Sequence, residues 1–593
     1  MRFDPTAFRN FGEALAAQAA AAPGHPALTL HRPGQDDGGT VTITYAELVR
    51  RARRRAAMLR RRLAPGDRVM IALPTGADFV ELFLGCLEAG AVAVPAPPPN
   101  TSSAAERVAG IAADCTPALV FARAEDHDSV VAQLRGCGQE RVAIEQPAAP
   151  DENAPIGKPR QGSPGPDRLA VLQYSSGSTG RPRGVMLTHG AVLANLAAMG
   201  QALPIGADDV VCTWVPLHHD MGLFAQLSVA LLHGAHVVLM PPTDFVRRPV
   251  EWLRMMDRFG ATISAGPNFA YDLCRRVLAE DQLQGLDLSR VRVILNGAEP
   301  IQPATMRRFT DLCAGTGLPA HAVAPAYGLA EATVYVSISR PALRPAVHRV
   351  DVAAMQSGPR PYVRAAADGD AEVVGLGRSL LYETRIVDPD TWQILPDDHI
   401  GEVWLSGPGM GQGYWNQQEL NQHVFHARIT GGGTSADRAR TWLRTGDLGA
   451  VLDGDIVIQG RLKDMLIVRG RNLAPHDLEH EAQAAHEALT GLVGAAFGVA
   501  VPDERIVLVH EVSPRVKAAD LSAVAVAVTR RLTAATGAPV RNVLLVRRGG
   551  VGRTTSGKIQ RRATRDRFLA GDISPVYAVL DPEVRALVGL SDG

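Results

Sequence analysis

A turn rich in glycine and hydroxyl side chains occupies residues 175–180, between two apolar, β-prone runs. Its members are Ser175, Ser176, Gly177, Ser178, Thr179 and Gly180. Glycine permits positive φ and close backbone approach, so amide N–H groups can converge on an anion while the hydroxyls add further donors. Arg181 and Arg183 supply positive charge directly after the turn. The turn therefore suits a polyphosphate, and we expect it to join two strands.

Two other interpretations of this turn have to be compared with the first. A Walker-type phosphate loop ends in GK[ST] and opens a helix, whereas Gly184 is followed here by Val-Met-Leu, which favours a strand. That interpretation is excluded. An ordinary flexible Ser/Gly surface loop remains open as long as the turn is considered alone.

An aromatic ring precedes a carboxylate by four residues in segment 325–333. Tyr327, which is followed by Gly328, offers a flat face to a purine, and Glu331 offers the oxygen ligand that Mg²⁺ prefers. Taken alone, the segment also fits a core tyrosine followed by a surface glutamate.

Two more segments could contact a nucleoside. Residues 296–299, which follow an expected strand at 291–295, could present main-chain groups to the base, although a plain βα turn is the alternative. These residues are Asn296, Gly297, Ala298 and Glu299. Asp447 lies on an expected tight turn, where a fixed carboxylate can accept hydrogen bonds from two ribose hydroxyls.

The last two stretches lie nearer the C-terminus. Residues 460–479 form a long segment with many charged and otherwise distinctive residues, Arg461 and Lys463 among them. Lys558 lies on a glycine turn within residues 554–561. Five such stretches in this order and spacing are improbable by chance, and together they point to one nucleotide site.

The elements that position these residues alternate between helices and strands. A capping box from Thr44 to Glu47 and apolar residues at helical spacing predict an amphipathic helix over 45–63, whose arginines face mostly outward. A strand at 69–73, a helix at 77–89 and a strand at 91–94 then predict α/β structure with parallel pairing.

A smaller α/β pattern begins after residue 460, so we expect a domain boundary near residues 461–464. Its expected elements are a helix at 476–489, strands at 493–501 and 505–512, a helix at 520–536 and a strand at 542–547.

The composition argues against several partner classes. Lys+Arg and Asp+Glu both number 61, so no global field attracts nucleic acid or an anionic membrane. The arginines of segment 45–63 lack interleaved aromatics, which favours a solvated face over a nucleic-acid patch. The longest apolar stretch, 222–240, contains Gln226 and two histidines and predicts a buried helix and strand, with no integral membrane segment. Six scattered cysteines without a CxxC pair fit a reducing cytoplasm.

The five stretches together resemble those of the adenylate-forming superfamily of acyl-CoA synthetases and nonribosomal adenylation enzymes, over nearly the whole chain. The resemblance implies an α/β protein with a large N-terminal domain of several α/β subdomains, residues 1–460, and a small, mobile C-terminal α/β domain, residues 461–593. It also implies ATP and Mg²⁺ as cofactors.

The resemblance assigns a role to each motif. The turn at 175–180 would hold the β- and γ-phosphates, and segment 296–299 with Tyr327 and Gly328 would surround the adenine. Asp447 and Arg461 would hold the ribose, and Lys463 would be the hinge of the mobile domain.

The catalytic residues follow in the same way. Lys558 would contact both the substrate carboxylate and the α-phosphate, and Glu331 would bind Mg²⁺. Thr179 and His219 complete the catalytic set that the resemblance implies.

Within the superfamily the chain is most similar to fatty acyl-AMP ligases. Segments 214–222, 266–274 and 296–300 resemble that branch's versions, and the extra stretch 348–375 resembles its characteristic insertion, which we expect to dock through its apolar residues. Arg183 stands where the glycine-rich loop of these proteins commonly has a lysine, which keeps the charge but changes its geometry. Ala474 stands where the branch often has a tyrosine.

The implied reaction is ATP-dependent activation of a medium- or long-chain fatty acid to an acyl adenylate, with release of pyrophosphate. Transfer to the phosphopantetheine thiol of a holo acyl carrier protein of a polyketide or nonribosomal peptide pathway would follow. Phe269 and Ala270 would line the acyl tunnel, unless their segment is plain core. A fatty acyl-CoA synthetase and a non-catalytic nucleotide-binding scaffold are the alternatives.

Overall fold

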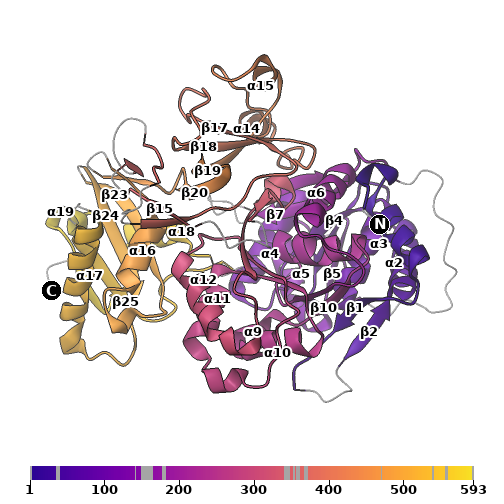
Figure 1. Cartoon of the computed structure of the whole chain (residues 1–593), viewed down its shortest axis with the longest axis horizontal. Coiled ribbons are helices and arrows are strands. Elements are labelled where there is room, and N and C mark those ends of the chain that lie inside the picture. Colours follow the sequence, from indigo (N-terminus) through magenta and orange to yellow (C-terminus); the bar gives the residue numbers. More distant parts are fainter. Residues whose placement is uncertain are drawn as a thin grey trace.

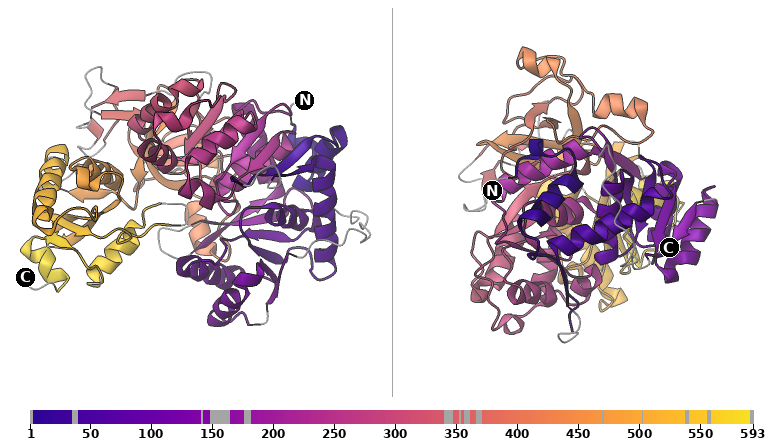
Figure 2. Two further views of the ribbon diagram at one scale, coloured as in Figure 1. Left: turned by 90° about the horizontal axis from the view of Figure 1, so that it is seen from below. Right: turned by 90° about the vertical axis from the view of Figure 1, so that its right-hand side faces the viewer.

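The computed structural model describes residues 3–34, 40–140, 142–147, 164–175, 182–339, 347–351, 354–355, 361–365, 371–468, 471–501, 503–536, 540–554 and 558–589. In Figure 1 the C-terminal part, coloured orange to yellow, lies at one end of the molecule and the two largest sheets lie at the other. Figure 2 shows the same separation from two further sides. The α/β fold class expected from the sequence is confirmed.

A six-stranded sheet carries the glycine-rich turn, and its strand order is β6-β5-β3-β4-β7-β8. The strands are β3 (Arg68–Ala72), β4 (Val92–Pro95), β5 (Leu119–Ala122), β6 (Ala143–Glu145), β7 (Leu169–Ser175) and β8 (Arg183–Thr188). All neighbours are parallel except β7 and β8, which are antiparallel. The expected parallel pairing of the two strands around α3 (Ala77–Ala89) is confirmed.

This sheet separates two hydrophobic cores, because successive side chains of a strand point to opposite faces. Val69 and Ile71 of β3 belong to the largest core of the molecule. Met70 and Ala72 instead pack in a second core with α4 (Ser102–Cys115) and α5 (His127–Gly136).

An eight-stranded sheet follows the order β14-β13-β12-β11-β9-β10-β1-β2. The strands are β1 (Pro26–Leu30), β2 (Val41–Thr44), β9 (Val210–Thr213), β10 (His236–Leu239), β11 (Ile263–Pro267), β12 (Val293–Gly297), β13 (Val323–Tyr327) and β14 (Ser337–Ile338). The accompanying helices include α1 (Phe11–Ala21), α2 (Tyr45–Arg60), α6 (His189–Ala202), α8 (Val229–Leu232), α9 (Pro242–Arg247), α10 (Val250–Arg258), α11 (Asn268–Val277) and α12 (Pro303–Leu312). Strands β11, β12 and β13 are parallel, so segments 296–299 and 327–331 emerge at the same sheet edge.

A four-stranded antiparallel sheet supports the predicted insertion. It contains β17 (Glu383–Val387), β18 (Gly401–Ser406), β19 (Leu443–Leu452) and β20 (Asp455–Arg461), and α14 (Gln418–Val424) and α15 (Ser435–Ala439) lie between β18 and β19 in the chain. The two ends of the insertion pair with each other as antiparallel strands, β15 (Val347–Val350) and β16 (Ala371–Val374). Val350, Met355 and Val363 share a buried cluster with residues of β19 and β20, which confirms that these apolar side chains dock.

The C-terminal part has a sheet of its own, β23 (Gly494–Val501), β24 (Asp503–Glu511), β25 (Asn542–Val546) and β26 (Tyr577–Val579). A hairpin of β21 (Leu466–Val468) and β22 (Arg471–Leu473) precedes it, and its helices are α16 (Pro475–Gln483), α17 (Leu521–Thr536), α18 (Arg561–Leu569) and α19 (Pro582–Leu587). The helix expected at 476–489 is shorter than predicted, and a separate 3₁₀ turn covers Glu487–Leu489. Two hydrophobic clusters on its faces draw only on residues from Leu466 onward, and the boundary near 461–464 remains a prediction.

Across the described ranges, no helix is long and apolar enough to cross a membrane. The apolar stretch 222–240 forms short helical segments, a π-helical turn (Leu223–Ser228) and strand β10. All six cysteines are free thiols.

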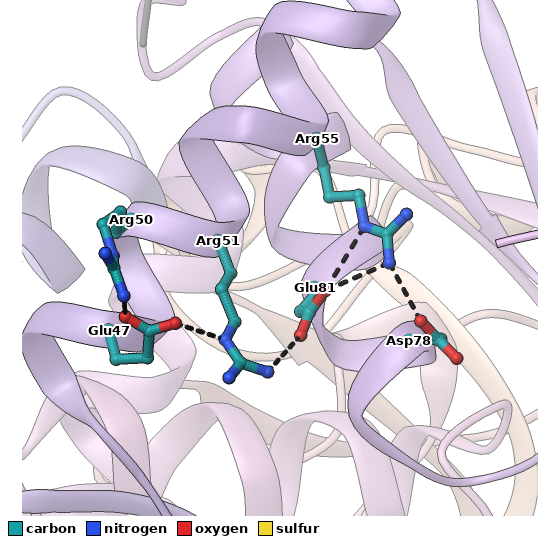
Figure 3. A network of polar contacts seen from close by, with 6 residues as sticks. All are labelled: Glu47, Arg50, Arg51, Arg55, Asp78 and Glu81. Atoms are coloured by element: carbon teal, nitrogen blue, oxygen red, sulfur yellow. Dashed lines mark hydrogen bonds and ion pairs between the residues drawn. The ribbon is translucent and has the colours of Figure 1, made fainter. Parts of the chain in front are cut away.

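One arginine of α2 corrects the expectation of an outward-facing basic helix. Arg55 is 1% exposed, and its guanidinium pairs with Glu81 at 3.1 Å and with Asp78 at 2.9 Å on α3. Arg51 reaches the same Glu81 at 3.1 Å and also pairs with Glu47, as Figure 3 shows. Helical periodicity predicts which residues share a face of α2. It does not reveal that α3 brings two carboxylates against the face that contains Arg55.

We expect Arg55→Met to lower the free energy of unfolding by about 3 kcal/mol, because it leaves the buried Glu81 carboxylate with Arg51 alone. Arg50→Met is the matched control, since Arg50 pairs with Glu47 at the surface of the same helix and should cost less than about 1 kcal/mol. Denaturant titration of both variants makes the measurement. Equal effects of the two substitutions would contradict a structural role for the buried network.

Candidate functional site

The two ends of the glycine-rich turn lie opposite each other in a hairpin. Ser175 closes β7 and is paired with Arg183 at the start of β8, so the expected strand-turn-strand arrangement is confirmed. The Arg183 guanidinium lies 5.4 Å from the centre of the Tyr414 ring. The other members of the turn, Ser176, Gly177, Ser178, Thr179 and Gly180, lie outside the described residues.

The Asp447 carboxylate is held on both of its oxygens. The Tyr327 hydroxyl donates a hydrogen bond of 2.6 Å to one oxygen, and Arg461 Nε lies 2.7 Å from the other. Asp447 is 5% exposed, and its charge raises the pKa of Arg461 above the usual range. Three residues that the sequence suggested separately are therefore in direct contact, which is the arrangement that a rigid ribose-binding carboxylate requires.

Glu331 is positioned by an aromatic residue from a distant part of the chain. The Tyr414 hydroxyl donates a hydrogen bond of 2.6 Å to Glu331 Oε1, and the Gly411 N–H donates to the Glu331 carbonyl at 2.8 Å. Within the ranges described, no group of three or more acidic, histidine or cysteine side chains could hold a metal ion. A single carboxylate fits Mg²⁺ bound together with ATP, because this ion usually takes one or two protein carboxylates and completes its shell with phosphate oxygens and water.

The turn after β12 is fitted closely to its neighbours. A Cβ on Gly297 would lie 2.9 Å from the Ala326 carbonyl oxygen, and one on Gly328 would lie 1.7 Å from that of Val334. Ala298 has a φ of 67°, so the backbone at this point is held in a conformation that L-residues avoid. Asn296 is fully buried and donates to Asn268 Oδ1 at 3.2 Å. The glycines here serve close contact between chain segments that border the expected adenine site.

Glu299 connects this turn with the wall expected for the acyl chain. Its carboxylate accepts a hydrogen bond from the Phe269 N–H at the start of α11. The Phe269 ring meets Trp214 edge-on at 6.2 Å, and Trp214 stacks on Phe245 at 3.8 Å. Burial raises the pKa of Glu299 to about 7, although the charges of Lys558 and Arg553 oppose the shift. The acyl tunnel itself stays a prediction.

Burial lowers the pKa values of both histidines that precede Asp220. The rings of His218 and His219 are 4.4 Å apart, and burial followed by the charge of Arg107 lowers the pKa of His218 to about 3. Burial, the neighbouring His218, Arg107 and Lys558 lower the pKa of His219 well below its ordinary value. A role for His219 as a cation is therefore disfavoured in the absence of a bound anion.

Lys558 belongs to the C-terminal part, yet its charge reaches groups of the N-terminal part. It opposes the burial that raises the pKa values of Asp220 and Glu299. Its own turn is closed by a Thr554 N–H bond to the Lys558 carbonyl at 2.8 Å. Burial and four surrounding arginines, Arg183 among them, lower the pKa of Lys463. The structure thus brings Lys558 towards the expected reaction centre.

Two residues that position the site were missed from the sequence. Tyr414 follows a glycine-rich run at 407–413, which could have drawn attention to it. Asn195 of α6 donates to the Ala332 and Tyr335 carbonyls at 2.9 and 2.8 Å and so fixes the segment after Glu331. No local pattern around Asn195 signals this role.

Comparison with known proteins agrees with this geometry. Residues 15–415 match the family described as AMP-binding enzyme. The chain belongs to this family. AMP-binding enzymes of this kind are adenylate-forming ligases that use ATP, and the resemblance stated from the sequence motifs is confirmed.

Three proteins show what this chain is similar to within the family. The long-chain-fatty-acid–AMP ligase FadD32 of Mycolicibacterium smegmatis is 36% identical over 91% of this chain and 90% of its own. A putative fatty-acid–CoA ligase, FadD25 of Mycobacterium tuberculosis, is 35% identical over 88% of this chain and 91% of its own. The crystal structure of a fatty acyl-adenylate ligase from Legionella pneumophila, in complex with acyl adenylate and pyrophosphate, has a TM-score of 0.74 and 28% identity, and covers 97% of this chain and 98% of that one.

The raised pKa of Glu299 predicts a pH dependence of stability. Its folded pKa of about 7 exceeds the ordinary 4.5, so between these values the folded chain holds a proton that the unfolded chain has released. Stability therefore falls as pH rises through this window, by at most about 1.4 kcal/mol per unit, and Glu299→Gln should flatten the fall. Unfolding measured between pH 5 and pH 8 checks this, with Glu106→Gln, an exposed glutamate of α4, as the control. A Glu299→Gln profile parallel to that of the wild type would refute the assignment.

Proposed function

We propose that this AMP-binding enzyme is a fatty acyl-AMP ligase, which converts a fatty acid and ATP to acyl adenylate and pyrophosphate. The observation that carries the proposal is the 36% identity with FadD32 over 91% of the chain. The contacts of Tyr327, Asp447 and Arg461 support it, because they prepare one fixed carboxylate for the ribose.

The proposed reaction begins when a carboxylate oxygen of the acid attacks the α-phosphorus of ATP. The bond from this phosphorus to the bridging oxygen breaks, and pyrophosphate leaves with the electron pair. Both reactants are anions, so we assign to the Lys558 ammonium the task of holding the carboxylate beside the α-phosphate. One such preorganised group typically contributes about 3 to 4 kcal/mol to transition-state stabilisation.

We assign Mg²⁺ to Glu331. The Tyr414 hydroxyl is bonded to Oε1 of this carboxylate, so Oε2 is the oxygen that we assign to the ion. A bound Mg²⁺ would supply positive charge that offsets the negative charge developing on the phosphates. The Tyr414 hydroxyl fixes the rotamer of Glu331 and so orients the remaining oxygen.

The second step would transfer the acyl group to the phosphopantetheine thiol of a holo acyl carrier protein in the cytoplasm. The thiol displaces AMP from the adenylate, and a thioester forms. Lys558 has no task in this step, so we propose that the C-terminal domain, residues 461–593, turns about Lys463 to admit the carrier arm.

A CoA synthetase is the second candidate, because FadD25, a putative fatty-acid–CoA ligase, is similar at nearly the same level. The insertion at 348–375 motivates our preference for the carrier protein. Its residues Val350, Met355 and Val363 are buried against β19 and β20, so it is a docked element that can restrict which acceptor reaches the site.

Product analysis by mass spectrometry tests the proposal directly. The wild-type protein is given a panel of fatty acids, ATP and either CoA or a holo carrier protein. We expect acyl-AMP with medium- or long-chain acids, acylated carrier protein, and little acyl-CoA. Comparable rates with both acceptors would favour the CoA synthetase, and absence of any adenylate would favour a non-catalytic scaffold.

Lys558→Ala separates the two steps. We expect adenylate formation to fall by about 10² to 10³, because the charge beside the α-phosphate is lost, while transfer from supplied acyl-AMP to the carrier protein stays within a few-fold of the wild type. Single-turnover assays of each step make the comparison. Equal damage to both steps would contradict the division of labour.

A further inference from the structure

The last turn of helix α11 faces the C-terminal part of the chain. In Figure 1 this helix lies on the side of the N-terminal part that is nearest to the orange and yellow ribbons. Arg276 belongs to the last turn, and its Nη1 donates a hydrogen bond to the Gly491 carbonyl, 215 residues further along the chain. Gly491 lies in the loop between the 3₁₀ turn Glu487–Leu489 and β23. A direct contact therefore joins α11 to the C-terminal part.

The backbone of Gly491 is suited to this contact. Its φ of 72° lies in the left-handed region, which glycine adopts without steric cost. A Cβ at this position would collide with the Arg276 side chain, both at the guanidinium and at Cδ. The conformation of the loop and the close approach of the arginine therefore both depend on the absence of a side chain at residue 491.

The first turn of α11 borders the groups that surround Lys558. Its Phe269 N–H donates a hydrogen bond to the Glu299 carboxylate, and the charges of Lys558 and Arg553, both from the C-terminal part, act on that carboxylate. Arg553 is also close enough to the last turn of α11 for the charge of Arg276 to act on it. One helix of ten residues, about 15 Å long, thus faces the C-terminal part at both of its ends.

Hydrophobic packing is separate in the two parts. The clusters of the C-terminal part contain only residues from Leu466 onward, and those of the N-terminal part contain residues up to Ile458. Across the described ranges, then, no hydrophobic cluster spans both parts. Polar contacts such as the bond from Arg276 to Gly491 therefore have a large influence on how the two parts are oriented, and they can break and form again at low cost.

We infer that Arg276 is a positioning residue for adenylation, which holds the C-terminal part in the orientation that brings Lys558 to the reaction centre. This role rests on the proposed adenylation and on the task assigned there to Lys558. Lys558 has no task in the transfer step, so the bond to Gly491 has to break before the C-terminal part can turn. Arg276 thus favours the first step and acts on it through Lys558.

Kinetics of the separate half-reactions of Arg276→Ala test the inference. Single-turnover adenylate formation with saturating ATP and fatty acid should slow by about 3- to 10-fold, because a charged hydrogen-bond donor that is partly exposed to solvent is lost. The KM values for both substrates should change by less than about 2-fold, and transfer from supplied acyl-AMP to a holo carrier protein should not slow. Arg276→Lys keeps a cationic donor and should recover most of the rate.

Arg275→Ala is the matched control. Arg275 lies on the same helix, its side chain is 34% exposed against 31% for Arg276, and both pair with Asp272, at 3.9 and 4.0 Å. This variant removes the local ion pair but leaves the bond to Gly491 in place. It should resemble the wild type in both half-reactions.

Gly491→Asn tests the same contact from the C-terminal side. Asparagine tolerates positive φ, but its Cβ would collide with Arg276, so adenylation should slow in this variant as well. In the double variant Arg276→Ala/Gly491→Asn the collision is removed and the hydrogen bond is already lost. The double variant should therefore be no slower than Arg276→Ala alone, which is the non-additivity expected of two residues in contact.

Several results would overturn the inference. An unchanged rate of adenylation in Arg276→Ala would show that the residue does not position Lys558. Equal slowing of both half-reactions, or a raised KM for the fatty acid, would make Arg276 a support of α11 and its acyl wall. Additive losses in the double variant would separate Arg276 from Gly491. Wild-type protein that forms no adenylate would instead refute the proposed adenylation, and the role of Arg276 with it.

Discussion

The buried Asp447 carboxylate links the four-stranded sheet to the eight-stranded sheet at the expected nucleotide site. Tyr327 approaches it from the end of β13 in the eight-stranded sheet, and Arg461 approaches from the end of β20, where the chain leaves for the C-terminal part. The ion pair with Arg461 lies within the four-stranded sheet and offsets the cost of burying the carboxylate, and the hydrogen bond from Tyr327 ties that carboxylate to the eight-stranded sheet. The expected nucleotide site at this junction depends on that contact.

Positive charge around the site far exceeds what the neutral chain as a whole suggests. Lys463 lies among arginines that lower its pKa, Arg107 has no ion-pair partner among the described residues, and Lys558 approaches from the C-terminal part. Such crowding costs stability in the empty protein. It becomes favourable when a triphosphate enters, because the ligand supplies the missing negative charge in a region of low dielectric.

The remaining precision of the site comes from contacts between distant segments. Tyr414 fixes Glu331, Asn195 fixes the carbonyls of Ala332 and Tyr335, and Glu299 holds the first turn of α11. Tyr414 and Asn195 lie outside the recognised motifs, whereas Glu299 belongs to the segment at 296–299, so the motifs alone do not define how the site is held. The insertion extends this pattern on a larger scale, since its apolar side chains complete a core with β19 and β20.

Local pattern in the sequence determined much of this protein. Apolar spacing predicted α3 to the residue, and glycine and hydroxyl composition predicted the strand-turn-strand at Ser175, because both depend on neighbours within a few positions. The motifs also indicated the family and grouped Tyr327, Asp447 and Arg461 by function. Only the tertiary structure decided that Arg55 is buried, that Tyr414 holds Glu331, and that Arg107 donates a hydrogen bond to the Tyr174 carbonyl near the end of β7. Burial and pairing depend on which surface packs against a given helix face, and residues far away in the chain supply that surface.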